Sequence, residues 1–318
     1  MSQKPIVPIF FTIDESYAPW LAVALVSMKE NASRGYHYDV HVIQTDLTPE
    51  TEARLKEIGD DDFEIIIDRL PSDLSSIQDR KGNYLRADYF TLTIFYRLFL
   101  PELFRQYDKA IYIDSDIVVP GDISRLYETD LEGNLLGVVN DYSVAAVPPL
   151  VDYIENAIGV DHTRYFNSGV LLMDFKQLRE KNLAGRFLEL QNTYKFDTIA
   201  PDQDYLNAMC KDRVYYLDHT WDSMPCHLDE FENPQLIHYN LFDKPWCYDN
   251  IKYEDYFWKY AKKSGFEKEI RDFKEHYGRE QIDSDNAARE ALVKQGMEIR
   301  NRDHGRMIDI IGVSEERL

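Results

Sequence analysis

The 318-residue chain is poor in cysteine, in basic residues and in long apolar runs, and each shortage excludes a class of protein. Its three cysteines, Cys210, Cys226 and Cys247, form no CxxC pair and are odd in number, which favours reduced thiols over a disulfide framework. No stretch approaches the roughly 20 apolar residues that span a bilayer. The apolar N-terminal stretch is too short and too interrupted by proline for a signal peptide. We therefore expect a soluble, cytoplasmic protein.

The shortage of basic residues argues against a nucleic-acid partner. The chain has 36 Lys and Arg against 57 Asp and Glu, a net charge of −21, whereas phosphate backbones require a basic surface. Residues 1–250 carry a net charge of −20, while residues 251–318 hold 14 basic and 15 acidic side chains. This shift predicts a main domain over residues 1–250 and a helical C-terminal extension over residues 251–318.

Several motifs of nucleotide-binding and hydrolytic enzymes are also missing. No GxGxxG follows the first apolar run, and no GxxxxGK[ST] is present, so dinucleotide-binding and P-loop functions lose their main support. Neither HExxH nor the GxSxG of a nucleophile elbow occurs. What the chain offers instead is a set of acidic residues at the ends of apolar runs.

Short runs rich in Ile, Val and Phe alternate with longer amphipathic stretches, which is typical of an α/β protein with a mostly parallel sheet. We expect strands over 5–14, 38–46, 63–70, 110–119, 135–141, 168–175, 213–218 and 236–240, and helices over 17–32, 48–59, 87–104 and 176–194. Ligands of such sheets bind beyond the carboxyl ends of the strands. That edge should hold Asp14, Asp46, Asp114 and Asp141, each of which ends an apolar run.

The segment AIYIDSDIVV places two carboxylates in the middle of an apolar strand. Because strand side chains alternate between faces, Asp114 and Asp116 should converge, with Ser115 turned away. Two like charges held together need a cation, and Mg²⁺ or Mn²⁺ prefers such oxygen ligands. A structural alternative stays open, in which Asp116 begins a turn and Asp122 caps a helix.

Two further segments carry polar groups beside apolar runs. In QLIHYNLFDKPW, His238 is placed to offer a ring nitrogen to the same cation, and Lys244 to contact a phosphate. The alternative is a core histidine beside a surface lysine. In FNSGVLLMDF and PDQDYLNAMC, Asn167, Asp202 and Gln203 suit sugar hydroxyls, or else form a turn and a helix N-terminus.

Together, FTIDESY, YRLFLPELF, DKAIYIDSDIVVPGDI, YFNSGVLLMDF, PDQDYLNA and IHYNLFDKPW resemble, in this order, glycosyltransferase family 8 over residues 5–250. The family includes bacterial lipopolysaccharide galactosyl- and glucosyltransferases and general stress protein A. The resemblance implies a GT-A fold, with a Rossmann-like, mostly parallel sheet flanked by helices. It also implies a UDP-galactose or UDP-glucose donor, Mn²⁺ or Mg²⁺, a glycan or glycolipid acceptor, and retention of anomeric configuration.

The resemblance also assigns a role to each matching residue. The metal ligands are Asp114, Asp116 and His238, and Lys244 contacts the diphosphate. The uracil lies at Asp14 and Tyr17. The other donor contacts are Arg97, Ser115 and Asn167, and the groups around the reacting sugar are Gln203, Asp141 and Asp202.

Gln203 corresponds to the residue lying across the anomeric carbon. An amide is a poor nucleophile, so we expect attack from the face that UDP leaves rather than double displacement. Two other functions stay open: a nucleotidyltransferase, and a catalytically idle sugar-nucleotide-binding protein. Residues 252–279 are basic and aromatic, so the extension is either a helical cap, which we prefer, or a weak peripheral contact with the inner face of the membrane.

Overall fold

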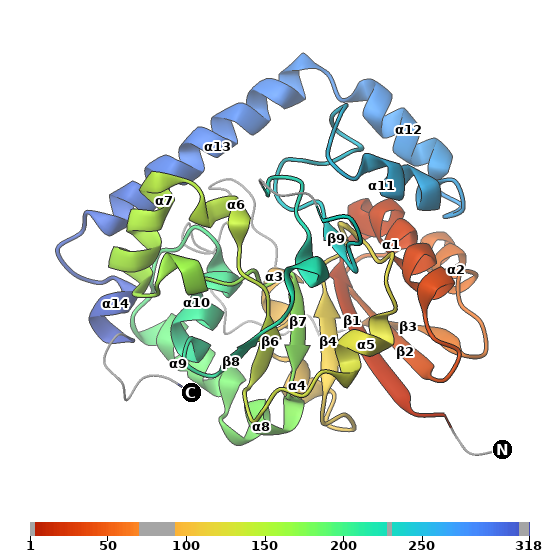
Figure 1. The fold of residues 1–318 in the computed structure, drawn as a ribbon. Coiled ribbons are helices and arrows are strands. Elements are labelled where there is room, and N and C mark those ends of the chain that lie inside the picture. The colour runs from red at the N-terminus through yellow and green to blue at the C-terminus, as the bar shows by residue number, and fades with distance from the viewer. Residues whose placement is uncertain (1–3, 70–92, 228–230, 312–317) are drawn as a thin grey trace.

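The computed structural model describes residues 4–69, 93–227, 231–311 and 318 (Figure 1). A seven-stranded sheet in the order β3-β2-β1-β4-β7-β6-β8 forms the centre, and helices cover both of its faces. Within it only β7 runs antiparallel to its neighbours. The prediction of an α/β fold with a mostly parallel sheet is therefore confirmed.

Each expected strand contains an observed one. The strands are β1 (Ile6–Ile13), β2 (His37–Gln44), β3 (Phe63–Arg69), β4 (Ala110–Ile113), β5 (Ile117–Val118), β6 (Leu136–Val138), β7 (Val170–Met173), β8 (Val214–Tyr216) and β9 (Ile237–His238). The expected strand over 110–119 is split by the two aspartates into β4 and β5. β5 leaves the main sheet and pairs with β9 in a separate antiparallel ribbon.

The helices before residue 200 are η1 (Glu15–Tyr17), α1 (Ala18–Asn31), α2 (Pro49–Lys56), α3 (Thr93–Tyr96), α4 (Leu100–Leu103), α5 (Ile123–Glu128), α6 (Tyr142–Ala145), α7 (Pro148–Tyr153), η3 (Ile154–Ile158), η4 (His162–Arg164), α8 (Phe175–Glu180) and α9 (Leu183–Thr193). Those after it are α10 (Pro201–Cys210), η5 (His219–Asp222), α11 (Glu254–Ala261), α12 (Glu267–His276), α13 (Arg279–Arg300) and α14 (Met307–Ile310).

Local sequence explains most helix starts. Thr48 accepts a hydrogen bond from the backbone N–H of Thr51 at the start of α2, and Asp122 accepts one from Ser124 at the start of α5. The long helix expected over 87–104 is wrong in its described part. Residues 93–104 form two short helices, and Pro101, which lacks a backbone N–H, lies in the first turn of the second, where a proline interrupts a longer helix but is tolerated at a helix start. Residues 87–92 lie outside the described residues.

The apolar runs fill two cores, one on each face of the sheet. Phe10 and Tyr112 point into one core, whereas their neighbours Ile9 and Ile111 point into the other. Successive strand side chains face opposite ways, so a run that is apolar at every position serves both cores. The carboxyl ends of β1, β4 and β6 therefore meet at one edge, where the apolar runs give way to aspartates.

The elements after residue 250 lie against the rest of the chain. α11 and α12 pack on α1, and α13 runs past the carboxyl-end edge of the sheet to reach α7 (Figure 1). The ring of Phe273 in α12 packs edge-on against Trp20 with ring centroids 5.2 Å apart, although Phe273 stays 43% exposed, and Phe257 in α11 is buried. This packing favours the helical cap, and peripheral membrane contact stays a prediction. No helix of the described residues combines the length and apolar composition needed to cross a bilayer.

Candidate active site

A cavity of ≈ 530 Å³ opens at the carboxyl ends of β1, β4 and β6. Because β7 is antiparallel, its amino end, preceded by Asn167, Ser168 and Gly169, reaches the same edge. The cavity is lined by ten of the twelve residues that the sequence selected, namely Asp14, Tyr17, Arg97, Asp114, Ser115, Asp116, Asp141, Asn167, Asp202 and Gln203. The other two, His238 and Lys244, are buried behind Asp116. Ser115 is not turned away, because β4 ends at Ile113 and the alternation of an extended strand ends with it.

Asp114 is held by a buried arginine. Its Oδ1 accepts hydrogen bonds from Nη2 of Arg97 at 2.9 Å and from the hydroxyl of Tyr112 at 2.8 Å. Its Oδ2 accepts none from the described residues. The Arg97 guanidinium also donates to the carbonyl oxygen of Ser168 at 2.6 Å, and its Nε lies 3.1 Å from Oδ2 of Asp202. Arg97 thus holds two cavity carboxylates together while one oxygen of Asp114 remains available.

Asp116 is held by a lysine and a histidine. Lys244 donates to Oδ2 of Asp116, and Nε2 of His238 lies 3.3 Å from Oδ1. Burial would raise the pKa of Asp116, but the charges of Lys244 and His238 outweigh it and hold that pKa well below its usual range. Burial would likewise lower the pKa of His238, but the carboxylates of Asp222 and Asp116 raise it to about 10.

The two aspartates do converge, as the sequence suggested, but each has a cation of its own. Arg97 balances Asp114 and Lys244 balances Asp116. Charge alone therefore does not require a metal ion between them. Whether the site suits a metal must be judged from its donor atoms instead.

The donor atoms fit a hard divalent cation. One oxygen each from Asp114 and Asp116 and one nitrogen of His238 lie within 4.8 Å of one another. Nδ1 of His238 lies 3.1 Å from Oδ1 of Asp222, the kind of outer carboxylate that orients a metal-binding imidazole. A Cβ added at Gly169 would lie 2.4 Å from Cε1 of His238 and 2.7 Å from Oδ2 of Asp114. The glycine therefore keeps this space open.

The polar side chains beside Asp114, Asp116 and His238 hold one another in place by hydrogen bonds. Oδ2 of Asp141 accepts hydrogen bonds from Nε2 of Gln203 at 2.8 Å and from Nδ2 of Asn167 at 3.2 Å. Oε1 of Gln203 accepts from the backbone N–H of Ser168 at 3.0 Å. Ser168 also donates its hydroxyl hydrogen to Oδ2 of Asp202 at 2.8 Å. The amide of Gln203 is thus locked in one orientation at the cavity wall.

Asp14 and Tyr17 form the far end of the cavity, where β1 passes into η1. Oδ1 of Asp14 accepts a hydrogen bond from the backbone N–H of Tyr17 at 3.2 Å and caps the short helix that carries the ring. The carboxylate and the aromatic ring are thereby held beside each other, which suits a planar base with an N–H group.

Sequence reasoning missed several residues of this site. Asp222 lies in η5 and follows no apolar run, so no pattern marks it. Ser168 and Gly169 stand in a segment that was selected for Asn167 alone. Ser284, Asp285, Ala288 and Leu292 of α13 also line the cavity, although the sequence placed them in a separate extension.

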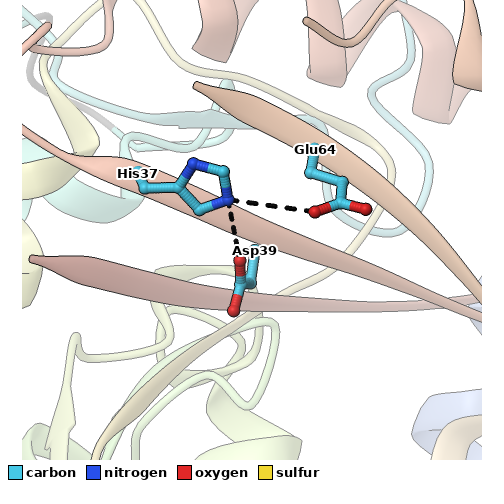
Figure 2. A group of neighbouring side chains, drawn as sticks. All are labelled: His37, Asp39 and Glu64. Carbon is cyan, nitrogen blue, oxygen red and sulfur yellow. Dashed lines mark ion pairs between the residues drawn. The ribbon is translucent and has the colours of Figure 1, made fainter. Parts of the chain in front are cut away.

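A second group of similar composition lies at the opposite edge of the sheet (Figure 2). There Nε2 of His37 lies 3.2 Å from Oδ1 of Asp39 and 3.9 Å from Oε2 of Glu64. The other oxygen of Asp39 accepts a hydrogen bond from the Tyr107 hydroxyl at 2.6 Å. The Glu64 side chain is 63% exposed. We interpret this group as a surface ion-pair network.

Comparison with known proteins agrees with the geometry. A family model for glycosyl transferase family 8 matches residues 8–250. General stress protein A of Bacillus subtilis (strain 168) is 27% identical over 268 residues, which cover 77% of this chain and 89% of that protein. Lipopolysaccharide 1,2-glucosyltransferase of Escherichia coli (strain K12) is 26% identical over 269 residues, covering 77% of this chain and 75% of that protein. The structure of galactosyltransferase LgtC in complex with donor and acceptor sugar analogs superposes with a TM-score of 0.68 at 26% identity, covering 81% of this chain and 96% of LgtC.

Proposed function

The chain belongs to glycosyltransferase family 8, and on that premise we propose that it is a retaining, metal-dependent hexosyltransferase. It takes galactose or glucose from a UDP-sugar and transfers it to a glycan or glycolipid acceptor, as in the biosynthesis of lipopolysaccharide or another cell-surface glycan. The observation that carries this proposal is the Asp114, Asp116 and His238 donor set at the wall of a cavity that also holds Asp14, Tyr17 and Gln203.

The donor is held along the cavity by residues of three kinds. Asp14 accepts the N3–H of uracil, while the ring of Tyr17 stacks on the base. Asp114, Asp116 and His238 would hold Mn²⁺ or Mg²⁺, which would supply positive charge to neutralise the diphosphate. Lys244 uses two of its three N–H groups on Asp116 and on the carbonyl oxygen of Tyr239, which leaves the third for a phosphate oxygen.

In the transfer step, the bond between the anomeric carbon and the β-phosphate oxygen breaks, and its electron pair leaves with UDP. The acceptor hydroxyl oxygen forms the new bond from the same face, and its proton passes to the leaving phosphate oxygen. Gln203 lies across the sugar and orients it, since its amide is fixed by Asp141 and Ser168. Positive charges placed near the departing diphosphate stabilise the transition state most strongly where water is excluded.

The hydrogen bonds beside Gln203 speak against double displacement. That route needs a free carboxylate close to the anomeric carbon. Asp141 accepts hydrogen bonds from Ser143, Asn167 and Gln203, and Asp202 is paired with Ser168 and Arg97. Both carboxylates are thereby made poorer nucleophiles.

The test is a transfer assay on the full chain with UDP-galactose or UDP-glucose and Mn²⁺. We expect UDP release that requires the metal, and an α-glycoside by NMR if the donor is α-linked. Gln203→Ala should slow transfer without abolishing it, since the amide orients the sugar and forms no obligatory bond. A β-linked product, or a covalent glycosyl-enzyme detected by mass spectrometry, contradicts the same-face route.

The same assay separates the two other functions. A nucleotidyltransferase would release pyrophosphate from a nucleoside triphosphate, which membership of a glycosyltransferase family disfavours. An idle sugar-nucleotide-binding protein would bind UDP-sugars in a thermal-shift screen and turn over none of them.

A further inference from the structure

We propose that α13 is the acceptor-binding wall of the cavity, and that Asp285 on it receives hydroxyl groups of an uncharged sugar acceptor. This inference rests on the proposed function, because it names the second substrate of the same site. α13 lies beyond the residues that the family model matches, and no role in the site was predicted for it from the sequence.

One face of α13 serves both the cavity and the protein core. Asp285, Ala288, Leu292, Gly296 and Ile299 follow one another at spacings of three or four residues, so they share a face of the helix. The first three line the cavity. Farther along, a Cβ added at Gly296 would lie 3.2 Å from Cδ2 of Leu150, which shows how closely α13 approaches α7.

The middle and the end of α13 are fixed to the part of the chain before residue 250. Midway along the helix, Arg289 pairs with Asp243 at 3.4 Å. At its end, Nε of Arg300 lies 2.7 Å from Oδ2 of Asp152 in α7. The helix is therefore a built wall of the cavity and not a detached tail.

Asp285 is held at the cavity with one oxygen uncommitted. The hydroxyls of Tyr248 and Tyr277 both donate to its Oδ2, at 2.6 and 2.8 Å. Its Oδ1 accepts no hydrogen bond from the described residues. The two tyrosines fix the direction of the carboxylate without consuming its acceptor capacity, which is what a hydroxyl-binding group requires.

Among the described residues, five other carboxylates line the cavity, and each already has a role. Asp14 is assigned to the base, Asp114 and Asp116 to the cation, and Asp141 and Asp202 are occupied by protein partners. Of the carboxylates that the structure describes at the cavity, Asp285 is the one left for the second substrate.

The charge of the wall selects against anionic sugars. Arg97 is the sole basic residue among the described residues that line the cavity; it donates to Asp114 and Ser168 and forms an ion pair with Asp202. A carboxylate or phosphate on the acceptor would face the like charge of Asp285, and Arg289, one turn farther along α13, is already paired with Asp243. Ala288 and Leu292, by contrast, offer an apolar surface to the C–H face of a neutral sugar.

The first experiment compares Ala288→Leu with Ala287→Leu, the same enlargement one residue away on the exposed face of α13. In Ala288→Leu the acceptor KM should rise about tenfold or more, because added methyl groups overpack the wall. The affinity for UDP should change less than twofold, and Ala287→Leu should match the wild type. Equal loss of UDP affinity, or an unchanged acceptor KM, overturns the proposal.

The second experiment uses Asp285→Asn, whose amide oxygen can still accept from both tyrosines, with Asp283→Asn as the control. KM for a neutral methyl hexoside should rise about ten- to hundredfold, the loss expected for a hydrogen bond to a charged group. The corresponding methyl uronoside should be a poor acceptor for the wild type and a relatively better one for Asp285→Asn. If the wild type prefers the uronoside, the proposal is wrong. If the wild type neither binds nor hydrolyses any UDP-sugar, the proposed function itself has failed.

Discussion

Two groups of one histidine and two carboxylates lie at opposite edges of the same sheet. At the carboxyl edge, the side chain of His238 is 2% exposed and Asp116 is 13% exposed. At the amino edge, the side chain of His37 is 27% exposed and that of Glu64 is 63% exposed. Burying charged groups costs free energy unless other groups compensate, and only the first group has buried cations to do so.

The difference shows that residue types and their separations do not identify a functional site by themselves. The carboxyl-edge group faces a cavity, and an outer carboxylate contacts its histidine. A glycine beside it leaves room that any larger side chain would fill. In the amino-edge group, the side chains are engaged in ordinary surface ion pairs with one another. Asp39 also accepts a hydrogen bond from the Tyr107 hydroxyl. We therefore expect equivalent mutations in the two groups to have different effects on transfer and on metal affinity.

The largest difference should appear between Asp116→Asn and Asp39→Asn, which are isosteric changes at the two edges. Asp116→Asn would remove a proposed metal ligand and the charge that pairs with Lys244, so transfer should fall by about 10²–10³ or more, the loss seen when one electrostatic contact of a transition state is removed. Asp39→Asn should keep transfer within twofold. Both are measured as UDP release at saturating donor, with thermal melting to check the fold. Full activity of Asp116→Asn would overturn the metal assignment.

Asp204 extends the comparison, because it is a buried carboxylate that no cation of the described residues neutralises. Asp204 accepts hydrogen bonds from the hydroxyls of Tyr153 and Tyr165, and burial raises its pKa from 3.8 to about 6. Between these values the native state binds the proton and the unfolded state releases it, so stability should fall as pH rises from about 4 to 6, by up to about 1.4 kcal/mol per pH unit. The stability difference between wild type and Asp204→Asn, measured by urea unfolding at both pH values, should show this slope. A difference that does not change with pH refutes the assignment.

A smaller effect is expected from the carboxylate behind His238. Asp222→Asn keeps the shape of the side chain but weakens the orientation of the imidazole, so Mn²⁺ affinity should fall about 10- to 100-fold, as for other outer-sphere partners. Titration of Mn²⁺ by electron paramagnetic resonance measures this directly, in the presence of UDP. Glu64→Gln, at the amino edge, is the matched control and should bind Mn²⁺ as the wild type does.

The smallest effect is expected from His37→Ala. Partly exposed ion pairs contribute about 0–1 kcal/mol, so the free energy of unfolding should change by no more than that. Transfer activity and Mn²⁺ affinity should be unchanged. A measurable drop in metal affinity would mean that the amino-edge group binds metal after all.

The fold was largely predictable because it follows from local patterns. Apolar runs at every position indicate strands buried on both faces, and aspartates that end such runs mark the ligand-binding edge. Asp114 and Asp116 were therefore selected from the local pattern, whereas the role proposed for Gln203 came from the resemblance to the family. The antiparallel direction of β7 was not, because strand direction depends on the partners that a segment meets in the folded chain.

The rest of the site could not be predicted for a similar reason. Asp222 reaches His238 through a turn of η5 that has no periodic pattern. Asp285 is one of many charged residues on α13, and only the packing of that helix against α7 shows which of them faces the cavity. Asp222 and His238 are 16 positions apart, and Asp285 is more than a hundred positions from α7, so no local window of sequence shows either contact.

The place of α13 also has a consequence for synthesis of the protein. The residues assigned to the donor and the cation all lie before residue 250, whereas the wall that faces them is completed by Leu292. Protein domains begin to fold while the chain is still being made, starting from the N-terminal part. On the ribosome, the donor half of the pocket would therefore form first, with the acceptor side still open. About forty more residues must be added before α13 can close that side.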